Sequence, residues 1–175
     1  MVMWDEIFKE ISEDYRDVNT DKMLVDAMTT RMVLDPKSID TVVASNLHAD
    51  ILTDLAASLS GSMGIAPTAN LDPDKRHPSM FEPIHGSAFD IMGKGIANPI
   101  GSYWSAVMML ENLGELQAAQ KLMFAIEKLT SDKKVLPKDL GGSSTTKQIT
   151  NAMIDIISGK NNYLNFKETK WIKVM

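Results

Sequence analysis

The spacing of hydrophobic residues in the first 60 positions predicts alternating helices and strands. Residues 2–15 carry apolar side chains three to five positions apart with acidic residues between them, which is typical of an amphipathic helix. Residues 23–25 form a short apolar run, and residues 39–45 (IDTVVAS) are rich in β-branched side chains, as in a buried strand. A helical pattern follows each run, at 27–34 and at 46–60. This alternation predicts an α/β fold.

The pattern changes in the second part of the chain. Residues 62–71 are less regular and are expected to be extended, and residues 72–79 form a polar loop that contains two prolines. Apolar residues then recur at spacings of three and four, which predicts helices at residues 102–113, 115–129 and 145–158. Residues 159–175 show no clear period, and we expect them to be loosely attached.

Residues 81–98 (FEPIHGSAFDIMGKGIAN) gather side chains that suit a nucleotide. Gly93 and Gly95 lack a Cβ atom, so the backbone can bend sharply and approach a ligand closely. Free N–H groups in such a loop suit anions and ring acceptors, and Asp90 could accept two hydrogen bonds from a ribose diol. A connecting loop in which His85 caps a turn explains the same residues, and the pattern alone leaves both interpretations open.

Acidic residues in the first part of the chain suggest a cation site. Asp50 and Asp54 lie four positions apart on the helix expected at 46–60, so both point to one side. Their repulsion would become attraction around Mg²⁺ or Mn²⁺, which prefer carboxylate oxygens. Asp26 ends the strand expected at 23–25 and could reach the same sheet edge, where open α/β folds bind ligands. The alternative is that these acids are solvated surface residues.

Composition narrows the function classes. The 175 residues are 44% hydrophobic, which suffices for one core or two small ones, and the net charge of −5 argues against nucleic-acid binding. The absence of cysteine excludes disulfides and thiolate zinc sites. No apolar run approaches the roughly 20 residues that span a bilayer. The acidic N-terminal residues do not match a signal peptide, so we expect a cytoplasmic protein.

The sequence also resembles a known family. The segments VDAMTTRMVL, NLHADILTDL and DPDKRHPSMFEPIHGSAFDI are similar to the β-hydroxyacid oxidative decarboxylases, which include isopropylmalate, isocitrate, tartrate and D-malate dehydrogenases. The resemblance covers about residues 1–157 without gaps in its motifs, and it is closest to the tartrate/D-malate branch. It implies the C-terminal portion of an isopropylmalate-dehydrogenase-like α/β fold.

The resemblance divides the chain into three parts. Residues 1–60 would belong to the small domain, which forms the dimer and binds metal. Residues 61–158 would belong to the later part of the large domain, with the loop that binds the adenosine of NAD, and residues 159–175 would be a divergent tail.

The resemblance also assigns roles to individual residues. Asp50 and Asp54 would bind Mg²⁺ or Mn²⁺ together with the substrate, and Asp26 would reach the metal site of a neighbouring subunit. Because a carboxylate repels a 2′-phosphate, the pair Asp90-Ile91 favours NAD over NADP. The residues assigned to NAD are Glu82 near the nicotinamide, His85, Gly86, Ser87 and Ala88 around the adenosine, Asp90 and Ile91 at the ribose, Asn98 at the adenine and Asp139 near the adenosine.

The implied activity is NAD- and metal-dependent oxidation, with decarboxylation, of a 2-hydroxydicarboxylate such as D-malate or tartrate. In that family the general base, the general acid and the substrate-binding arginines belong to an N-terminal half that these residues do not match. We therefore expect the chain to act with a complementing N-terminal half or as a homodimer, and to be inactive alone. The alternatives are a non-catalytic metal-, nucleotide-binding or dimerisation module, and isopropylmalate dehydrogenase activity.

Overall fold

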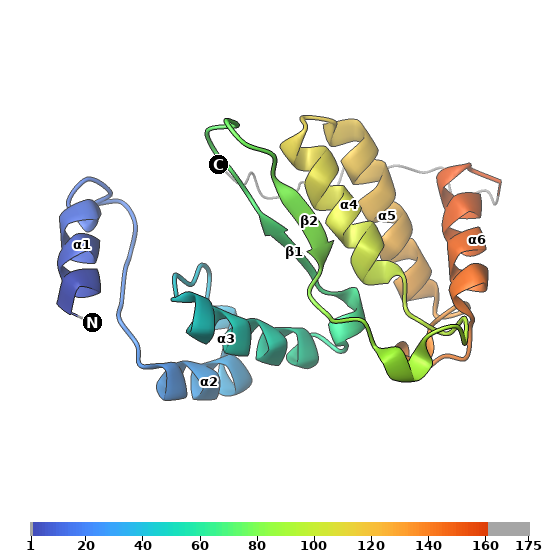
Figure 1. The fold of residues 1–175 in the computed structure, drawn as a ribbon, viewed down its shortest axis with the longest axis horizontal. Coiled ribbons are helices and arrows are strands. Elements are labelled where there is room, and N and C mark those ends of the chain that lie inside the picture. Colours follow the sequence, from blue (N-terminus) through green and yellow to red (C-terminus); the bar gives the residue numbers. More distant parts are fainter. Residues whose placement is uncertain (1, 161–175) are drawn as a thin grey trace. The chain divides into compact units, whose positions relative to one another are not determined.

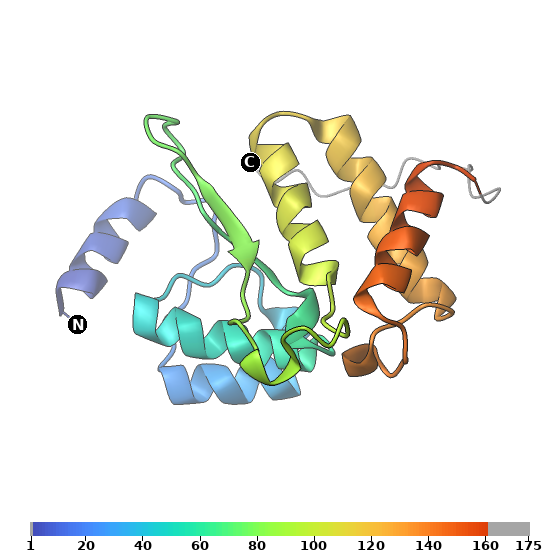
Figure 2. The ribbon, with the colours of Figure 1, turned by 45° about the vertical axis from the view of Figure 1, so that its right-hand side comes forward.

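The computed structural model describes residues 2–160 and contains two compact units, one that ends at Leu52 and one that begins at Thr53 (Figures 1 and 2). The first unit contains α1 (Val2–Ser12), α2 (Val25–Leu34), the short 3-10 helix η1 (Pro36–Ser38) and the start of α3 (Asn46–Leu59). The division predicted near residue 60 comes from the resemblance and stays a prediction, and the expectation for the tail concerns mostly residues 161–175, outside the described part.

The helices of the first unit form where the hydrophobic spacing predicts them. Asp5 lies in the first turn of α1 and Lys9 in its last turn, and both charges interact favourably with the helix dipole. Helix α2 ends where the N–H of Asp35 donates to the carbonyl oxygen of Arg31 at 2.8 Å. Pro36 follows directly, and a residue before proline is disfavoured in the α conformation, which explains the helix end.

The two strands predicted in the first 60 residues are wrong. Leu24 is 70% exposed, Val25 begins α2, and Val43 in the second run is 76% exposed. A strand requires a partner for its N–H and C=O groups, and no strand lies within residues 2–60 of the described structure. Residues 39–45 are rich in β-branched side chains, which favour strands. This preference depends on packing against neighbouring strands, and residues 2–60 contain none. Asp26 therefore lies in the first turn of α2, and α3 does not follow a strand.

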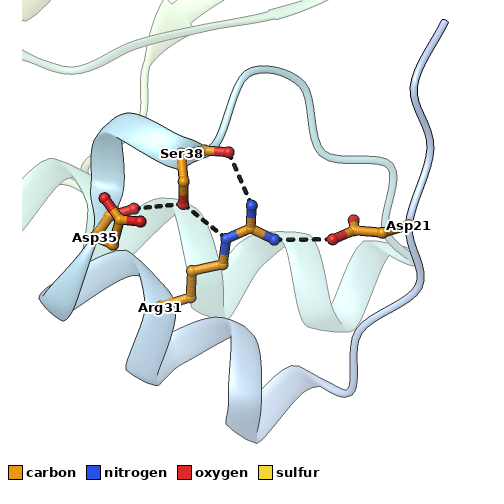
Figure 3. Close-up of polar contacts among 4 residues, drawn as sticks. All are labelled: Asp21, Arg31, Asp35 and Ser38. Atoms are coloured by element: carbon orange, nitrogen blue, oxygen red, sulfur yellow. Dashed lines mark hydrogen bonds and ion pairs between the residues drawn. The ribbon is translucent and has the colours of Figure 1, made fainter.

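In the part of the chain that the structure describes, no sheet supports the end of α2, and polar contacts around Arg31 hold it in place (Figure 3). The Nε atom of Arg31 donates to the Ser38 hydroxyl at 2.8 Å, and a terminal nitrogen donates to the Ser38 carbonyl oxygen at 2.9 Å. The other terminal nitrogen pairs with Asp21 at 3.0 Å, and the Ser38 hydroxyl donates to the Asp35 carbonyl oxygen at 2.7 Å. One guanidinium thereby links the segment before α2 to the turn after it.

The second unit contains a two-stranded antiparallel sheet. Strand β1 (Pro67–Asn70) follows the 3-10 helix η2 (Met63–Ile65), and it pairs with β2 (Met80–Pro83), with Pro67 opposite Pro83. In the connecting loop, Asp72 accepts hydrogen bonds from the backbone N–H groups of residues 74, 76 and 77 at 2.7–3.1 Å. A two-stranded sheet is marginal alone, and here both strands pack against α4 (Ile100–Asn112).

Three helices form the core of the second unit. Helix α5 (Leu116–Asp132) packs against both α4 and α6 (Thr146–Ile157), and Gly114 turns the chain between α4 and α5 with a φ of 84°. Thr145 and Gln148 form a capping box at the start of α6. The shared core consists of Ile100, Val107, Ala119, Ala125, Ile126, Leu129, Ile149 and Met153. The three helices predicted from the apolar spacing in the second half of the chain are therefore confirmed.

No helix within residues 2–160 is both long and apolar enough to cross a bilayer.

Truncation of Ile149 tests the assignment of this core. Ile149 is 0% exposed in α6, whereas Ile154 on the same helix is 51% exposed. We expect Ile149→Ala to lower the free energy of unfolding by about 2–5 kcal/mol, because it leaves a cavity. The control Ile154→Ala should change it by at most about 0.5 kcal/mol. Urea unfolding measures both values, and equal effects would contradict the packing.

Candidate functional site

The loop after β2 carries most of the residues predicted to bind a nucleotide. The backbone N–H of Ile84 still donates to the Ala66 carbonyl oxygen at 3.1 Å, after which the chain leaves the sheet. Residues 85–90 are exposed, and Ala88 has a φ of 43°, in the left-handed region that alanine rarely adopts. The short 3-10 helix η3 (Phe89–Ile91) follows, with the Ile91 N–H donating to the Ala88 carbonyl oxygen at 3.0 Å. The Asp90 carboxylate is thus exposed on a fixed turn, and it can accept hydrogen bonds from a diol.

Asn98, at the end of this loop, contacts Asp139, a second residue predicted to bind the nucleotide. The Nδ2 atom of Asn98 donates to Oδ2 of Asp139 at 2.8 Å, although the residues are 41 positions apart. The Ser62 hydroxyl donates to the same oxygen. The Ser62 hydroxyl also accepts the N–H of Gly64 at 2.9 Å. We call this set of four residues (Ser62, Gly64, Asn98 and Asp139) the Asp139 junction.

Gly64 leaves the space that the Asp139 junction requires. A Cβ atom at this position would lie 2.6 Å from Oδ2 of Asp139 and 2.9 Å from Nδ2 of Asn98. Both distances are shorter than a carbon atom tolerates, so a side chain at residue 64 would displace the two polar groups. Sequence reasoning missed Ser62 and Gly64. The serine two positions before a glycine was the available signal, because such a hydroxyl can cap a short turn.

A second tether joins the same loop to α6. Thr146 donates its backbone N–H to the Gly95 carbonyl oxygen at 2.9 Å and its hydroxyl to the Ala97 carbonyl oxygen at 2.6 Å. The loop is therefore held at residues 95–98, while residues 85–90 stay exposed. An exposed polar loop on an anchored base suits a ligand that is bound at the surface of the unit.

The predicted metal ligands lie on two helices. Asp50 and Asp54 are both exposed on α3, one helical turn apart, which agrees with their predicted placement on one side of a helix. Asp26 is exposed on α2, where its Oδ1 atom accepts the N–H of Ala27 at 2.8 Å. Within residues 2–160 no group of three or more His, Asp or Glu residues could hold a metal ion. The described chain therefore offers hard oxygen donors in a pair, and the metal assignments stay predictions.

Glu82 completes the set of predicted residues. It is exposed in β2, opposite Thr68. His85 has its Nδ1 atom 3.1 Å from the Gly86 carbonyl oxygen, a contact that is a hydrogen bond if Nδ1 carries the proton. This contact supports the turn interpretation of His85 without excluding a ligand at its exposed ring.

Two hollows in the structure do not include these residues. One of about 530 Å³ lies between α5 and α6, lined by Leu129, Asp132, Gln148 and Asp155 among others. One of about 510 Å³ in the first unit is lined by apolar side chains of α1 together with Tyr15, Val18 and Val43. The candidate site is thus the surface loop and its anchors rather than either hollow.

Comparison with known proteins establishes the family of this chain. The chain belongs to the isocitrate/isopropylmalate dehydrogenase family, which matches residues 1–157. It is 61% identical over 161 residues to a probable tartrate dehydrogenase/decarboxylase of Agrobacterium vitis, covering 92% of this chain and 45% of that protein. It is 44% identical over 162 residues to the D-malate dehydrogenase [decarboxylating] of Escherichia coli (strain K12), covering 90% and 45%. The chain spans about half the length of these curated relatives.

Solved structures confirm the fold class. The isocitrate dehydrogenase from Methylococcus capsulatus matches with a TM-score of 0.82 and 39% identity, covering 87% of this chain and 44% of that one. The β-decarboxylating dehydrogenase from Thermococcus kodakarensis, in its apo form, matches with a TM-score of 0.77 and 32% identity, covering 95% and 50%. The predicted α/β fold of this family is therefore confirmed, although the two strands expected in the first 60 residues are not formed.

Proposed function

We propose that this chain forms the nucleotide- and metal-binding part of an NAD-dependent enzyme that oxidises and decarboxylates a 2-hydroxydicarboxylate, D-malate or tartrate. The observation that carries the proposal is the 61% identity, over 92% of the chain, to a relative named as a probable tartrate dehydrogenase/decarboxylase. The relative named as a D-malate dehydrogenase supports the same substrate class.

The exposed loop would bind the adenosine half of NAD. His85, Gly86, Ser87 and Ala88 would surround the adenosine, and the Asp90 carboxylate would accept both ribose hydroxyls. The same carboxylate beside Ile91 would repel a 2′-phosphate and so favour NAD over NADP. The remaining contacts would come from Asn98 at the adenine, Asp139 near the adenosine and Glu82 near the nicotinamide.

Asp50 and Asp54 would hold Mg²⁺ or Mn²⁺ from one face of α3. Both carboxylates are exposed and one turn apart, which fits a cation that keeps water and substrate oxygens as its other ligands. Asp26 of a second copy of the chain would add a ligand. When bound, the cation supplies positive charge that stabilises negative charge developing on the substrate oxygens.

Each of the three arginines of this chain makes a polar contact within the chain. The Nε atom of Arg16 donates to the Glu13 carbonyl oxygen, Arg76 pairs with Asp74 at 2.6 Å, and Arg31 is engaged by Ser38 and Asp21. A proton must also leave the substrate hydroxyl, and a base for that step is expected in the N-terminal half of the family's enzymes. We therefore propose that turnover requires a complementing N-terminal half.

A non-catalytic metal- or nucleotide-binding module is the second candidate. It is favoured by the same observation that each of the three arginines is already engaged by other residues of this chain. Such a module would bind NAD or Mn²⁺ equally well, so binding alone does not separate the two candidates. Turnover after joining to a complementing half does.

Binding of NAD depends on Asp90 in this account. We expect Asp90→Ala to weaken NAD binding about tenfold or more, because the variant loses charge-assisted hydrogen bonds to the ribose. Isothermal titration calorimetry of the 175-residue chain measures the change. The control Asp74→Ala removes an exposed carboxylate that pairs with Arg76 in another loop, and it should leave the affinity unchanged. If millimolar NAD produces no heat of binding, the proposed nucleotide site is contradicted.

Turnover tests the proposed reaction. A chimera that joins the N-terminal part of the Escherichia coli D-malate dehydrogenase to this chain should form NADH from D-malate or tartrate with Mn²⁺. Asp54→Asn should lower kcat/KM about a hundredfold or more, since it removes a metal ligand. Absorbance at the NADH band measures the rate.

The control for this assay is Asp14→Asn, which neutralises an exposed carboxylate on the turn after α1 and should leave the rate unchanged. The chain without the joined half should give no NADH. Turnover by the chain alone would contradict the proposed division of the active site. A chimera that is folded and binds NAD but forms no NADH would favour the non-catalytic module.

A further inference from the structure

We infer that the Asp139 junction selects the base of the bound dinucleotide by fixing the orientation of the Asn98 amide. The inference rests on the proposed NAD site and adds a function for Ser62, Gly64 and Asp139. In this view Asn98 meets the base, and the other three residues are positioning residues that act through it.

Two contacts of opposite character fix the amide of Asn98. Its Oδ1 atom accepts the backbone N–H of Ile100 at 2.9 Å, and its Nδ2 atom donates to Oδ2 of Asp139 at 2.8 Å. A backbone N–H can only donate, and an ionised carboxylate can only accept. A flipped amide would place donor against donor and acceptor against acceptor, so both contacts favour the same orientation and the loss of either weakens the preference.

Ser62 and Gly64 hold the acceptor in place. The Ser62 hydroxyl has one hydrogen, which it donates to Asp139, and its oxygen accepts the Gly64 N–H at 2.9 Å. The chain of hydrogen bonds therefore runs in one direction, from Gly64 through Ser62 to Asp139. A Cβ atom at residue 64 would lie 2.6 Å from the Asp139 oxygen, so the bare glycine backbone is part of this arrangement.

The fixed amide leaves one donor and one acceptor for a ligand. Asparagine has two N–H donors and two lone pairs on its oxygen, and the junction uses one of each. Adenine presents its amino donor beside a ring-nitrogen acceptor, which an asparagine amide can match with two hydrogen bonds. The orientation of the amide decides which position on the base must donate.

Hypoxanthine exchanges the donor and the acceptor on this edge of the base. It carries a carbonyl acceptor at C6, where adenine carries the amino group, and an N1–H donor where adenine has an acceptor. An amide held by Ile100 and Asp139 would place its oxygen against the hypoxanthine carbonyl. An amide free to rotate could turn its N–H groups toward that carbonyl. The Asp139 junction thus favours adenine by preventing the flip.

The test compares NAD with nicotinamide hypoxanthine dinucleotide on the 175-residue chain by calorimetry. We expect the wild-type chain to bind NAD about tenfold more tightly than the hypoxanthine analogue. Asp139→Ala should lower this ratio by about threefold or more, because the amide loses one of its two constraints. A direct contact between Asp139 and the ribose, which both ligands share, affects both ligands and cancels in the ratio.

Matched variants separate this selection from a loss of fold. Ser62→Ala should lower the ratio in the same direction, and Ser62→Thr, which keeps the hydroxyl, should restore it. Ser60→Ala is the control, since that hydroxyl donates to the Ala56 carbonyl oxygen at 2.9 Å and not to the junction. Asp139→Asn keeps the shape of the side chain but can donate, so it provides a second variant if alanine prevents folding.

The outcomes distinguish the inference from the proposed function. If the wild-type chain binds no NAD, the nucleotide site and the inference both fall. If it binds NAD and the hypoxanthine analogue equally, the inference alone is overturned. It is also overturned if the Asp139 and Ser62 variants weaken both ligands by the same factor, since that is the signature of a merely structural role.

Discussion

The Oδ2 atom of Asp139 accepts hydrogen bonds from Ser62 and from Asn98, and the second of these contacts ties the end of the candidate nucleotide loop to the segment that contains Asp139. Asp139 lies in the 3-10 helix η4 (Lys138–Leu140), Ser62 precedes η2, and Asn98 precedes α4. One carboxylate therefore joins three segments that are distant in sequence. Hydrogen bonds to a charged acceptor are stronger than neutral ones, although exposure to water reduces this advantage.

Further hydrogen bonds hold the same loop close to its contact with Asp139. Thr146 adds two hydrogen bonds at residues 95 and 97, so the helical core of the second unit holds the loop from one side. Residues 85–90 carry no comparable core packing and are exposed, with the Asp90 carboxylate among them. A loop that is ordered at its base before a ligand arrives loses less conformational entropy on binding, and its exposed part remains available for contacts.

Local pattern predicted the helices because a helix makes its backbone hydrogen bonds within itself. The spacing of apolar residues predicted for α5 reproduces the buried face on which Ala119 and Ile126 lie. The strands expected at 23–25 and 39–45 failed because strand formation depends on a partner, and composition alone contains no information about one.

Some residues of the candidate site were likewise predicted from the sequence, and others were missed. Asn98 and Asp139 were predicted from family motifs, and the structure brings them together at 2.8 Å. Ser62 and Gly64 were missed because their contact with Asp139 spans 77 positions for the serine and has no periodic signal. The requirement for glycine at residue 64 becomes visible only when the oxygen that a Cβ atom would meet is placed in space.

Hydrogen exchange of the ligand-free chain in the variant Gly64→Ala tests most directly whether the Asp139 junction is one coupled unit. A Cβ atom there would push against the ends of the Asp139 and Asn98 side chains, while Gly86→Ala, with open space around its Cβ position, is the matched control. If the junction is one unit, we expect faster exchange in residues 62–65, 97–100 and 138–142 together in Gly64→Ala, and no change in these segments in Gly86→Ala. Faster exchange confined to the residues beside position 64 would contradict it.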